Sequence, residues 1–170
     1  MGSKNLVTSI FLAIILLYSC AHLGGRVIIF DDSDSKADVR MGQIKSAVSR
    51  KDSNALKSLF SKKSLDESDD IENCINELFR LVQGEIQSCE RGGFASSESI
   101  RGGKSSETVR FAFTLTTDIG SYLFFVVDYV KDTIEPENEG VYMLELIEYT
   151  DEKNLESWQN RLRAGVYILK

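Results

Sequence analysis

Carboxyl and phenol side chains occur inside strongly apolar segments in the second half of the chain. Asp128 and Tyr129 stand in "SYLFFVVDYV", and Tyr142 and Glu145 stand in "VYMLELIEY". A carboxyl group in an apolar pocket has a raised pKa and can exchange protons with a substrate, with a tyrosine as hydrogen-bond donor. Together with Trp158, the only tryptophan, these residues are our candidates for a ligand-binding pocket.

The sequence also suggests how these candidates are oriented. We expect Asp128, beside Tyr129, to lie at the end of a strand and to turn toward solvent. Glu145 alternates with Met143 and Ile147, so it faces either a pocket or an open face of the sheet. For Trp158 we expect a packing role, with the mouth of a pocket or a partner surface as the alternatives.

The remaining reactive residue types indicate no catalytic, metal or cofactor site. His22 is the only histidine, no CxxC or HxxxH spacing occurs, and no serine stands in a nucleophile elbow. Cys74 and Cys89 fall in one predicted helix, about 22 Å apart, which is beyond the reach of a disulfide unless the helix breaks at Gly84 and the chain turns back. We therefore expect two unbridged thiols, buried or half-buried.

The N-terminal segment has the pattern of an export signal. Lys4 precedes an apolar stretch from Leu6 to Tyr18, followed by small residues. As a helix this stretch would be about 20 Å long, whereas the hydrocarbon core of a membrane is about 30 Å thick. A spanning helix is therefore disfavoured.

The end of this segment, Leu17-Tyr18-Ser19-Cys20, resembles a lipobox, the recognition sequence of bacterial lipoprotein signal peptidase. Leu17 stands at position −3 and Ser19 at −1, while Tyr18 is larger than the residue usual at −2. The resemblance implies that the Cys20 thiol carries a diacylglycerol with palmitate-type chains and becomes the new N-terminus. The alternatives are a plain secretory signal cut near Ser19 or Ala21, and an uncleaved anchor.

These observations divide the chain into a lipoprotein signal peptide (residues 1–19), a tether (20–36) and a single domain (37–170). The expected location is the extracytoplasmic face of the cell membrane, with the membrane as a partner through the N-terminal lipid. Within the tether, Val27 to Phe30 forms either a short strand or a patch at the membrane surface.

Composition limits the class of protein. The chain has 170 residues, of which 42% are hydrophobic, enough for one domain with a real core. Acidic residues outnumber basic ones by 26 to 20, which gives a formal charge of −6. We expect no nucleic-acid partner, since binding to phosphates requires a concentrated basic surface.

Helical periodicity dominates the first half of the domain. We predict a helix in "ADVRMGQIKSAVSRKD", a short amphipathic segment after Asp52, caps in "SLDESDD", and a long helix from about Asp70 to Cys89. In the first of these helices, the residues expected near one face are Val39, Ile44, Ala47 and Val48.

Strand patterns dominate the second half. In "TVRFAFTLT" apolar and polar residues alternate, with Val109, Phe111, Phe113 and Leu115 on one face. The segment "SYLFFVVDYV" is apolar on both faces, as expected for a central strand. Further strands are expected in "VYMLELIEY" and near residues 164–169, and the two Gly-Gly pairs are expected at turns or bulges. Helices followed by antiparallel strands predict an α+β domain with the helices on one face of a curved sheet.

Five segments carry a resemblance to a known family: "NALKSLFSKKSLDE", "LFRLVQGEIQSCERGGFASSESIRGGK", "YLFFVVDYVKDT", "GVYMLELIEY" and "WQNRLRAGVYIL". They resemble a family of uncharacterised lipoproteins from Gram-positive (Firmicutes-type) gut bacteria, classed as a domain of unknown function. The resemblance implies a nuclear transport factor 2-like (cystatin-like) cone fold and a place in the cell envelope. It implies no activity.

Three roles are compatible with these patterns. The favoured one is a non-catalytic module that binds an envelope protein, a peptide, a glycan, a lipid or a small ligand. The alternative is a cone-pocket enzyme of the isomerase or dehydratase type that uses Asp128 or Glu145. The third is a homodimer in which exposed sheet faces pack together.

Overall fold

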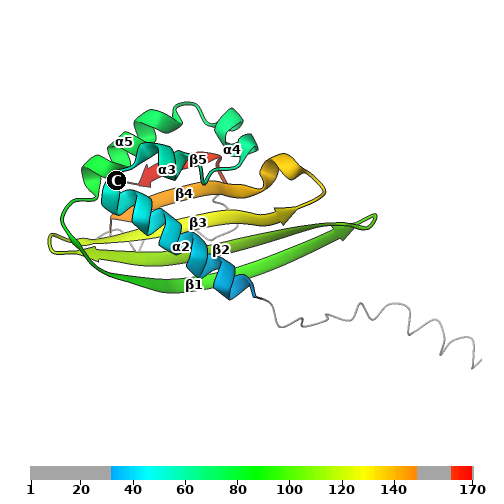
Figure 1. Cartoon of the computed structure of the whole chain (residues 1–170), viewed down its shortest axis with the longest axis horizontal. Coiled ribbons are helices and arrows are strands. Elements are labelled where there is room, and N and C mark those ends of the chain that lie inside the picture. Colours follow the sequence, from blue (N-terminus) through cyan, green and yellow to red (C-terminus); the bar gives the residue numbers. More distant parts are fainter. Residues whose placement is uncertain (1–31, 149–161, 170) are drawn as a thin grey trace, which may run out of the picture. The chain divides into compact units, whose positions relative to one another are not determined.

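The computed structural model describes residues 32–148 and 162–169. Four helices come first and a five-stranded sheet follows (Figure 1). The helices are α2 (Ser33–Arg50), α3 (Ser53–Lys57), α4 (Lys62–Glu67) and α5 (Ile71–Leu81). The strands are β1 (Ile86–Arg101), β2 (Lys104–Thr117), β3 (Ser121–Asp132), β4 (Gly140–Glu148) and β5 (Gly165–Leu169), with a 3-10 turn, η1 (Pro136–Asn138), before β4. The α+β class predicted from the sequence is confirmed.

Three of the described helices, α3, α4 and α5, begin at a side chain that accepts a hydrogen bond from one of their first free N–H groups, whereas Asp32 makes no such bond at the start of α2. Asp52 accepts from the N–H of Ala55 at 2.9 Å, which starts α3. Ser61 and Asp70 do the same for α4 and α5. Such a cap stabilises a helix by about 1 kcal/mol, and the predicted caps before α3 and α5 are confirmed. Helix α2 begins at Ser33, so residues 33–36, assigned above to the tether, form its first turn.

The predicted helix from Asp70 to Cys89 is wrong in its second half. Helix α5 ends at Leu81, and β1 begins at Ile86. Between them, the N–H of Glu85 donates to the Asp118 carboxylate at 2.7 Å, and the Glu85 carbonyl accepts from the Asp118 N–H. These bonds hold the chain at the turn after β2, so it leaves the helix and enters the sheet.

The two thiols therefore lie on different elements. Cys74 is on α5 and Cys89 on β1, both are free, and both are half-buried. Burial raises the pKa of both thiols above the ordinary value. The expectation of unbridged, half-buried cysteines is confirmed. The prediction that both cysteines lie in one helix is wrong.

The five strands follow one another across the sheet in sequence order, β1 to β5. The first four are antiparallel, whereas β5 runs parallel to β4, which the sequence did not reveal. β3 is the central strand, as predicted. Figure 1 shows α2 running obliquely across one face of this sheet, with α3, α4 and α5 toward β4 and β5.

The main core lies between the helices and this face of the sheet. The alternation predicted for β2 is confirmed, because its four apolar residues are fully buried there. Phe113 of β2 stacks on Phe124 of β3 with 4.8 Å between ring centroids. Helix α5 contributes Ile75 and Leu78, both without exposed surface. Among the described residues, no helix is long and apolar enough to cross a membrane.

Both Gly-Gly pairs occupy the kinds of position predicted for them. Gly92-Gly93 lies where the register between β1 and β2 shifts by one residue, as in a β-bulge. Gly102-Gly103 forms the two-residue turn of the β1–β2 hairpin, with φ of 58° and 79°. Two positive φ angles are what a tight hairpin turn of type I′ requires.

The start of β4 is held by the segment between α3 and α4. The N–H of Val141 donates to the Leu59 carbonyl at 2.9 Å, and the Val141 carbonyl accepts from the Ser61 N–H at 2.9 Å. Gly140 has φ of 125°, and a Cβ there would come within 2.9 Å of the Ser61 nitrogen. Only glycine fits this conformation and this close approach.

We expect Gly140→Ala to lower the free energy of unfolding by about 1–3 kcal/mol, the usual cost of a strained backbone conformation. Gly42→Ala is the matched control, because Gly42 lies in α2 and a Cβ at this residue would meet nothing within 4 Å. There the same change should stabilise the protein by about 0.5–1 kcal/mol. Urea unfolding followed by circular dichroism measures both, and equal effects would contradict the account.

Candidate functional site

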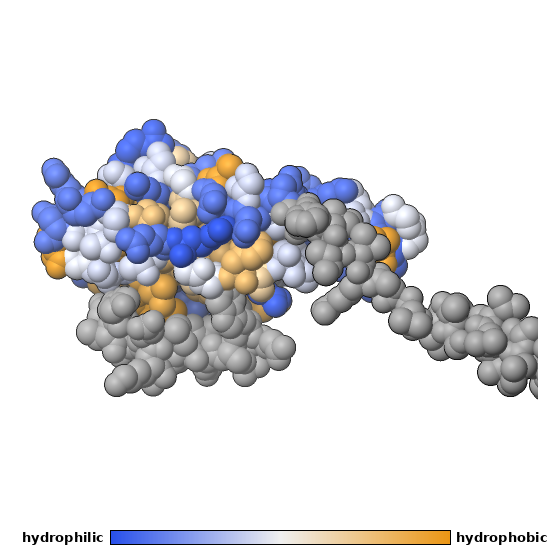
Figure 2. Space-filling model, turned by 90° about the horizontal axis from the view of Figure 1, so that it is seen from below, coloured by the Kyte–Doolittle hydropathy of each residue, from blue (hydrophilic) through white to orange (hydrophobic). Residues whose placement is uncertain are grey.

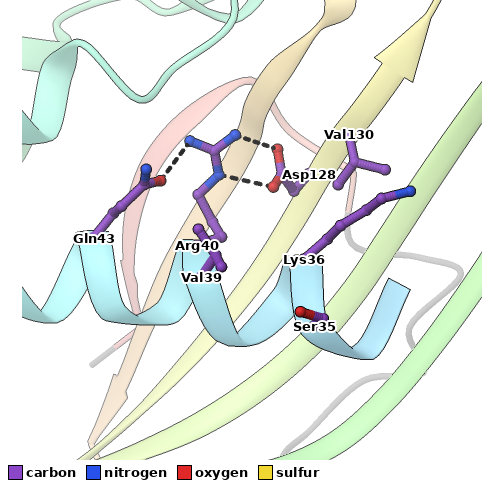
Figure 3. Close-up of a pocket in the computed structure, with 7 residues that line it drawn as sticks. All are labelled: Ser35, Lys36, Val39, Arg40, Gln43, Asp128 and Val130. Atoms are coloured by element: carbon purple, nitrogen blue, oxygen red, sulfur yellow. Dashed lines mark hydrogen bonds and ion pairs between the residues drawn. The ribbon is translucent and has the colours of Figure 1, made fainter. Parts of the chain in front are cut away.

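A hollow of about 290 Å³ lies between α2 and β3, where the helix crosses the sheet. Figure 3 shows Arg40 and Asp128 in direct contact in its wall, with Gln43 on one side of Arg40 and Lys36 on the other. The lining residues are Ser35, Lys36, Val39, Arg40, Gln43, Asp128 and Val130. This site combines a nearly fully buried carboxyl group with an opening to solvent.

Helical spacing places the lining residues of α2. Lys36, Arg40 and Gln43 are four and three residues apart, so they lie on neighbouring positions of one helix face. The buried stripe of α2 runs through Ala37 and Ile44, next to Arg40. Arg40 therefore leaves the helix at the border between the core and solvent.

The prediction that Val39 belongs to the core face of this helix is wrong. Its exposed fraction is 59%, whereas Ala37, which the prediction omitted, is fully buried. The buried face of the helix passes through Ala37 and Ile44 and leaves Val39 outside it, as an apolar part of the wall of the hollow.

The Arg40 guanidinium holds the Asp128 carboxylate with two hydrogen bonds. Arg40 Nε donates to Asp128 Oδ2 at 2.8 Å, and Nη2 donates to Oδ1 at 3.3 Å. Nη1 donates to Gln43 Oε1 at 3.1 Å, which fixes the plane of the guanidinium. This two-point geometry is the strongest type of ion pair that arginine makes.

Asp128 does not turn toward solvent, contrary to the prediction from the sequence, since only 1% of it is exposed. It follows Phe124 and Val126 on the face of β3 that packs against the helices. Burial raises the pKa of the Asp128 carboxyl above its ordinary value, and the Arg40 guanidinium offsets part of that rise. The partner of Asp128 thus lies on α2, 88 residues earlier in the chain, and the sequence of the strand alone does not indicate it.

A second ion pair stands beside the hollow. Lys36 Nζ lies 2.9 Å from Glu107 Oε2 and 2.9 Å from Asp32 Oδ1. The Ser33 hydroxyl donates to Glu107 Oε1 at 3.0 Å. Hydrogen bonds to Asp32 and then Glu107 raise the pKa of Lys36, so it remains a cation throughout the neutral range.

Both cations of the hollow are already paired. Arg40 is matched by Asp128, and Lys36 is matched by Glu107, whose side chain is 15% exposed, and by the exposed Asp32. A site whose cations are paired offers fixed hydrogen-bond donors and acceptors without a free positive charge for an anion. Such an arrangement suits recognition of an uncharged polar group.

The other candidate residues from the sequence lie on the opposite face of the sheet. Tyr129 and Tyr142 pack edge to face with 5.9 Å between ring centroids, close to Val127 and Met143. Tyr142 Oη donates to Glu67 Oε2 at 2.6 Å; burial and this bond raise the pKa of Tyr142 to about 12. The structure therefore brings these tyrosines together with each other and not with Asp128.

Glu145 is also on this second face, opposite Phe125 of β3 and Tyr167 of β5 in the ladder. Only 3% of it is exposed, so the open-face alternative considered for it is wrong. Trp158 lies outside the described residues.

Sequence reasoning missed Lys36, Arg40 and Glu107. One signal was present: two cations four residues apart stand next to an apolar stripe, while one strand carries a single carboxylate among apolar residues. A charge on the core side of each of two elements indicates that they pair with each other.

Two further hollows lack a buried ionisable group. One lies between α4 and η1, about 480 Å³, among exposed acidic residues and Lys63. The other lies beside β5, about 430 Å³, near Cys74 and Tyr167. Within the described ranges, no group of three or more histidine, cysteine, aspartate or glutamate residues is placed to hold a metal ion.

We expect Arg40→Leu to lower the free energy of unfolding at pH 7 by about 3–5 kcal/mol, because it leaves Asp128 buried and unpaired. Without Arg40, burial raises the pKa of Asp128 further above its unfolded value. The proton is then bound more tightly in the folded state, so the loss should shrink as the pH falls through that raised pKa.

Urea unfolding between pH 4 and pH 8 measures this effect. The double variant Arg40→Leu/Asp128→Leu should recover most of the loss, since it removes both charges. Lys62→Leu is the control, because its ion pairs with Asp66 and Glu137 are both exposed and should contribute little to stability. A loss that is independent of pH would contradict the role given to Asp128.

Comparison with known proteins gives a family and no activity. Residues 43–150, more than half of the chain, match the model of a family described as a domain of unknown function, DUF5104. This region runs from the middle of α2 to the end of β4 and includes Gln43 and Asp128 of the hollow. No curated protein matches the chain. The resemblance to an uncharacterised domain is thus confirmed, and the chain belongs to the DUF5104 family.

Proposed function

We propose that this protein is a membrane-anchored bacterial lipoprotein, of the Gram-positive type, whose domain is a non-catalytic binding module. The observation that carries the binding role is the hollow between α2 and β3, where a buried ion pair holds polar groups at the opening. The lipobox-like segment ending at Cys20 supports the anchor and a location on the extracytoplasmic face.

The chemistry of the hollow favours a neutral polar ligand with a small apolar part. Its size is near the lower limit for small-ligand sites, about 300 Å³. Arg40 has N–H groups beyond the three that bind Asp128 and Gln43, and Val39 and Val130 supply apolar contact. An uncharged peptide segment with small side chains has amide acceptors for Arg40 and methyl groups for the valines.

We also propose that the domain has the nuclear transport factor 2-like cone fold. Its support is the order of helices before a meandering sheet and the oblique helix α2 on one face (Figure 1).

One observation favours the alternative of an isomerase- or dehydratase-type enzyme, namely the raised pKa of Asp128 beside an open hollow. The binding role has the stronger support, because both carboxylate oxygens of Asp128 already accept hydrogen bonds from Arg40. In addition, Tyr129 and Glu145, the other candidate proton-transfer groups, lie across the sheet from Asp128.

The anchor is tested by metabolic labelling with an alkyne analogue of palmitate in a Gram-positive host. We expect the full chain to be labelled, to enter the detergent phase of Triton X-114, and to lose residues 1–19. Cys20→Ala should abolish all three, whereas Cys74→Ser should abolish none, since Cys74 is a half-buried thiol of the folded domain. A labelled Cys20→Ala variant would disprove the anchor.

The binding role is tested with the full chain in detergent micelles and isotope-labelled valine methyl groups. N-acetyl-trialanine amide should shift the NMR signals of Val39 and Val130, whereas trilysine and triglutamate should bind more weakly because the charged groups of the site are already paired with one another. Val39→Glu should reduce the shifts at Val130. Ile119→Glu, at a similarly exposed residue in the β2–β3 turn, should not. Stronger binding of a charged probe would contradict the proposal.

A further inference from the structure

In the part of the chain that the structure describes, the outer edge of β1 is the longest strand edge that no other strand covers. β1 runs from Ile86 to Arg101 and pairs with β2 on one side. Within residues 32–148 and 162–169, no other strand pairs with it, and Figure 1 shows α2 crossing over β1 obliquely, with the N-terminal end of the helix at this edge. A strand edge of this kind presents unpaired backbone N–H and C=O groups to its surroundings.

The hairpin turn determines which residues present these groups. In a two-residue turn, the flanking residues Arg101 and Lys104 exchange both of their backbone hydrogen bonds. From there the bonding pattern alternates along β1. The residues whose N–H and C=O groups point away from β2 are therefore Phe94, Ser96, Glu98 and Ile100.

This part of the edge lacks most of the devices that prevent strands from pairing. Natural edges usually carry lysine, proline or several charges. From Gly92 to Ile100, Glu98 is the only charged residue and no proline occurs. Figure 2 shows the molecule from the side of this edge, with separate hydrophobic areas rather than a continuous patch. The edge is therefore suited to backbone pairing more than to apolar docking.

One large apolar side chain on this edge, that of Ile100, is exposed to solvent. Ile100 is 72% exposed, the highest exposure among the large hydrophobic residues described. Phe94, six residues earlier, is half-buried beneath the Arg91 guanidinium. Both side chains are on the face of the sheet that carries the helices, because they pair with Phe111 and Ser105 of β2.

We propose that two copies of this chain pair antiparallel through β1, around a twofold axis at Ser97, to form one continuous sheet of ten strands, five from each copy. In this register Phe94 lies opposite Ile100 of the other copy, and Ser96 lies opposite Glu98. All outward N–H and C=O groups of these four residues then find partners. The Ser96 hydroxyl can donate to the Glu98 carboxylate of the other copy.

Charge and the bulge in β1 favour this register over those with the twofold axis at Glu98 or at Ser96. With the axis at Glu98, two carboxylates would lie directly opposite each other, which is destabilising. With the axis at Ser96, the Gly92-Gly93 bulge would interrupt the ladder at the residue that faces Ile100. The edge thus complements itself, which favours a second copy over an unrelated strand.

Disulfide cross-linking of the full chain in its membrane or in detergent tests the register. Two Ser97 residues would face each other as a non-hydrogen-bonded pair with Cα atoms about 4.5 Å apart, within the range of about 4.4–6.8 Å that a disulfide spans. Ser97→Cys should therefore give a covalent dimer on mild oxidation. Ala95→Cys is the matched control, because two such residues would lie about 13 Å apart along the strands.

The wild-type chain, oxidised in parallel, reports any dimer formed through Cys20, Cys74 or Cys89. A dimer from Ala95→Cys as abundant as that from Ser97→Cys would overturn the proposed register. No covalent dimer from either variant would overturn the pairing itself.

Light scattering in detergent tests the pairing without a new cysteine. The wild type should have the mass of two chains. Ser96→Pro should reduce it to one, because proline removes an outward N–H and leaves the bonds to β2 intact. Ser96→Ala keeps that N–H and should stay dimeric. Circular dichroism checks that all variants are folded; a monomeric wild type, or a folded Ser96→Pro dimer, would refute the proposal.

Discussion

The placement of α2 on the sheet depends on the ion pair between Arg40 and Asp128. In the N-terminal half of α2 the buried residues are small, Ser33 and Ala37, and they provide little apolar surface to fix the helix. Asp128 is buried on the sheet and must be compensated there, because an isolated buried carboxylate is strongly unfavourable. The two-point contact with Arg40 meets that requirement and, together with the bonds from Lys36 and Ser33 to Glu107, holds this half of the helix on the sheet.

The sheet separates two polar groups that are close in sequence. Successive residues of a strand point to opposite faces, so Asp128 and Tyr129 cannot contribute to one pocket while β3 remains regular. Asp128 joins Arg40 on the helix side, whereas Tyr129 joins Tyr142 on the other side. Adjacent residues that suggested a single site therefore belong to two different environments.

Local patterns predicted the parts of the fold that depend on local physics. The alternation in β2, the caps at Asp52 and Asp70, and the glycine turn at Gly102-Gly103 follow from periodicity and backbone geometry, and these predictions are confirmed. The end of α5 was missed because the chain leaves the helix before Gly84, whose φ is 88°, and is held beyond this residue by Asp118 from the far end of β2.

The candidate site was predicted only in part, for the same reason. Asp128 was recognised as unusual, yet its burial depends on a partner in a helix that precedes it by 88 residues. Neither periodicity nor residue type indicates which residue, 88 positions away, will pair with Asp128. The parallel placement of β5 beside β4 likewise depends on the connection between them and not on the pattern of either strand.

This long separation has a consequence for the order of assembly. The hairpins β1–β2 and β2–β3 join segments that are neighbours in the chain, so their closure costs little conformational entropy. Contact between α2 and β3 closes a much longer loop, and contacts of that kind slow folding. We expect the meander to form first and the helix to dock onto it. In that order the Asp128 carboxylate remains hydrated until α2 docks. The replacement of its hydrating water by the Arg40 guanidinium is then a late event in folding.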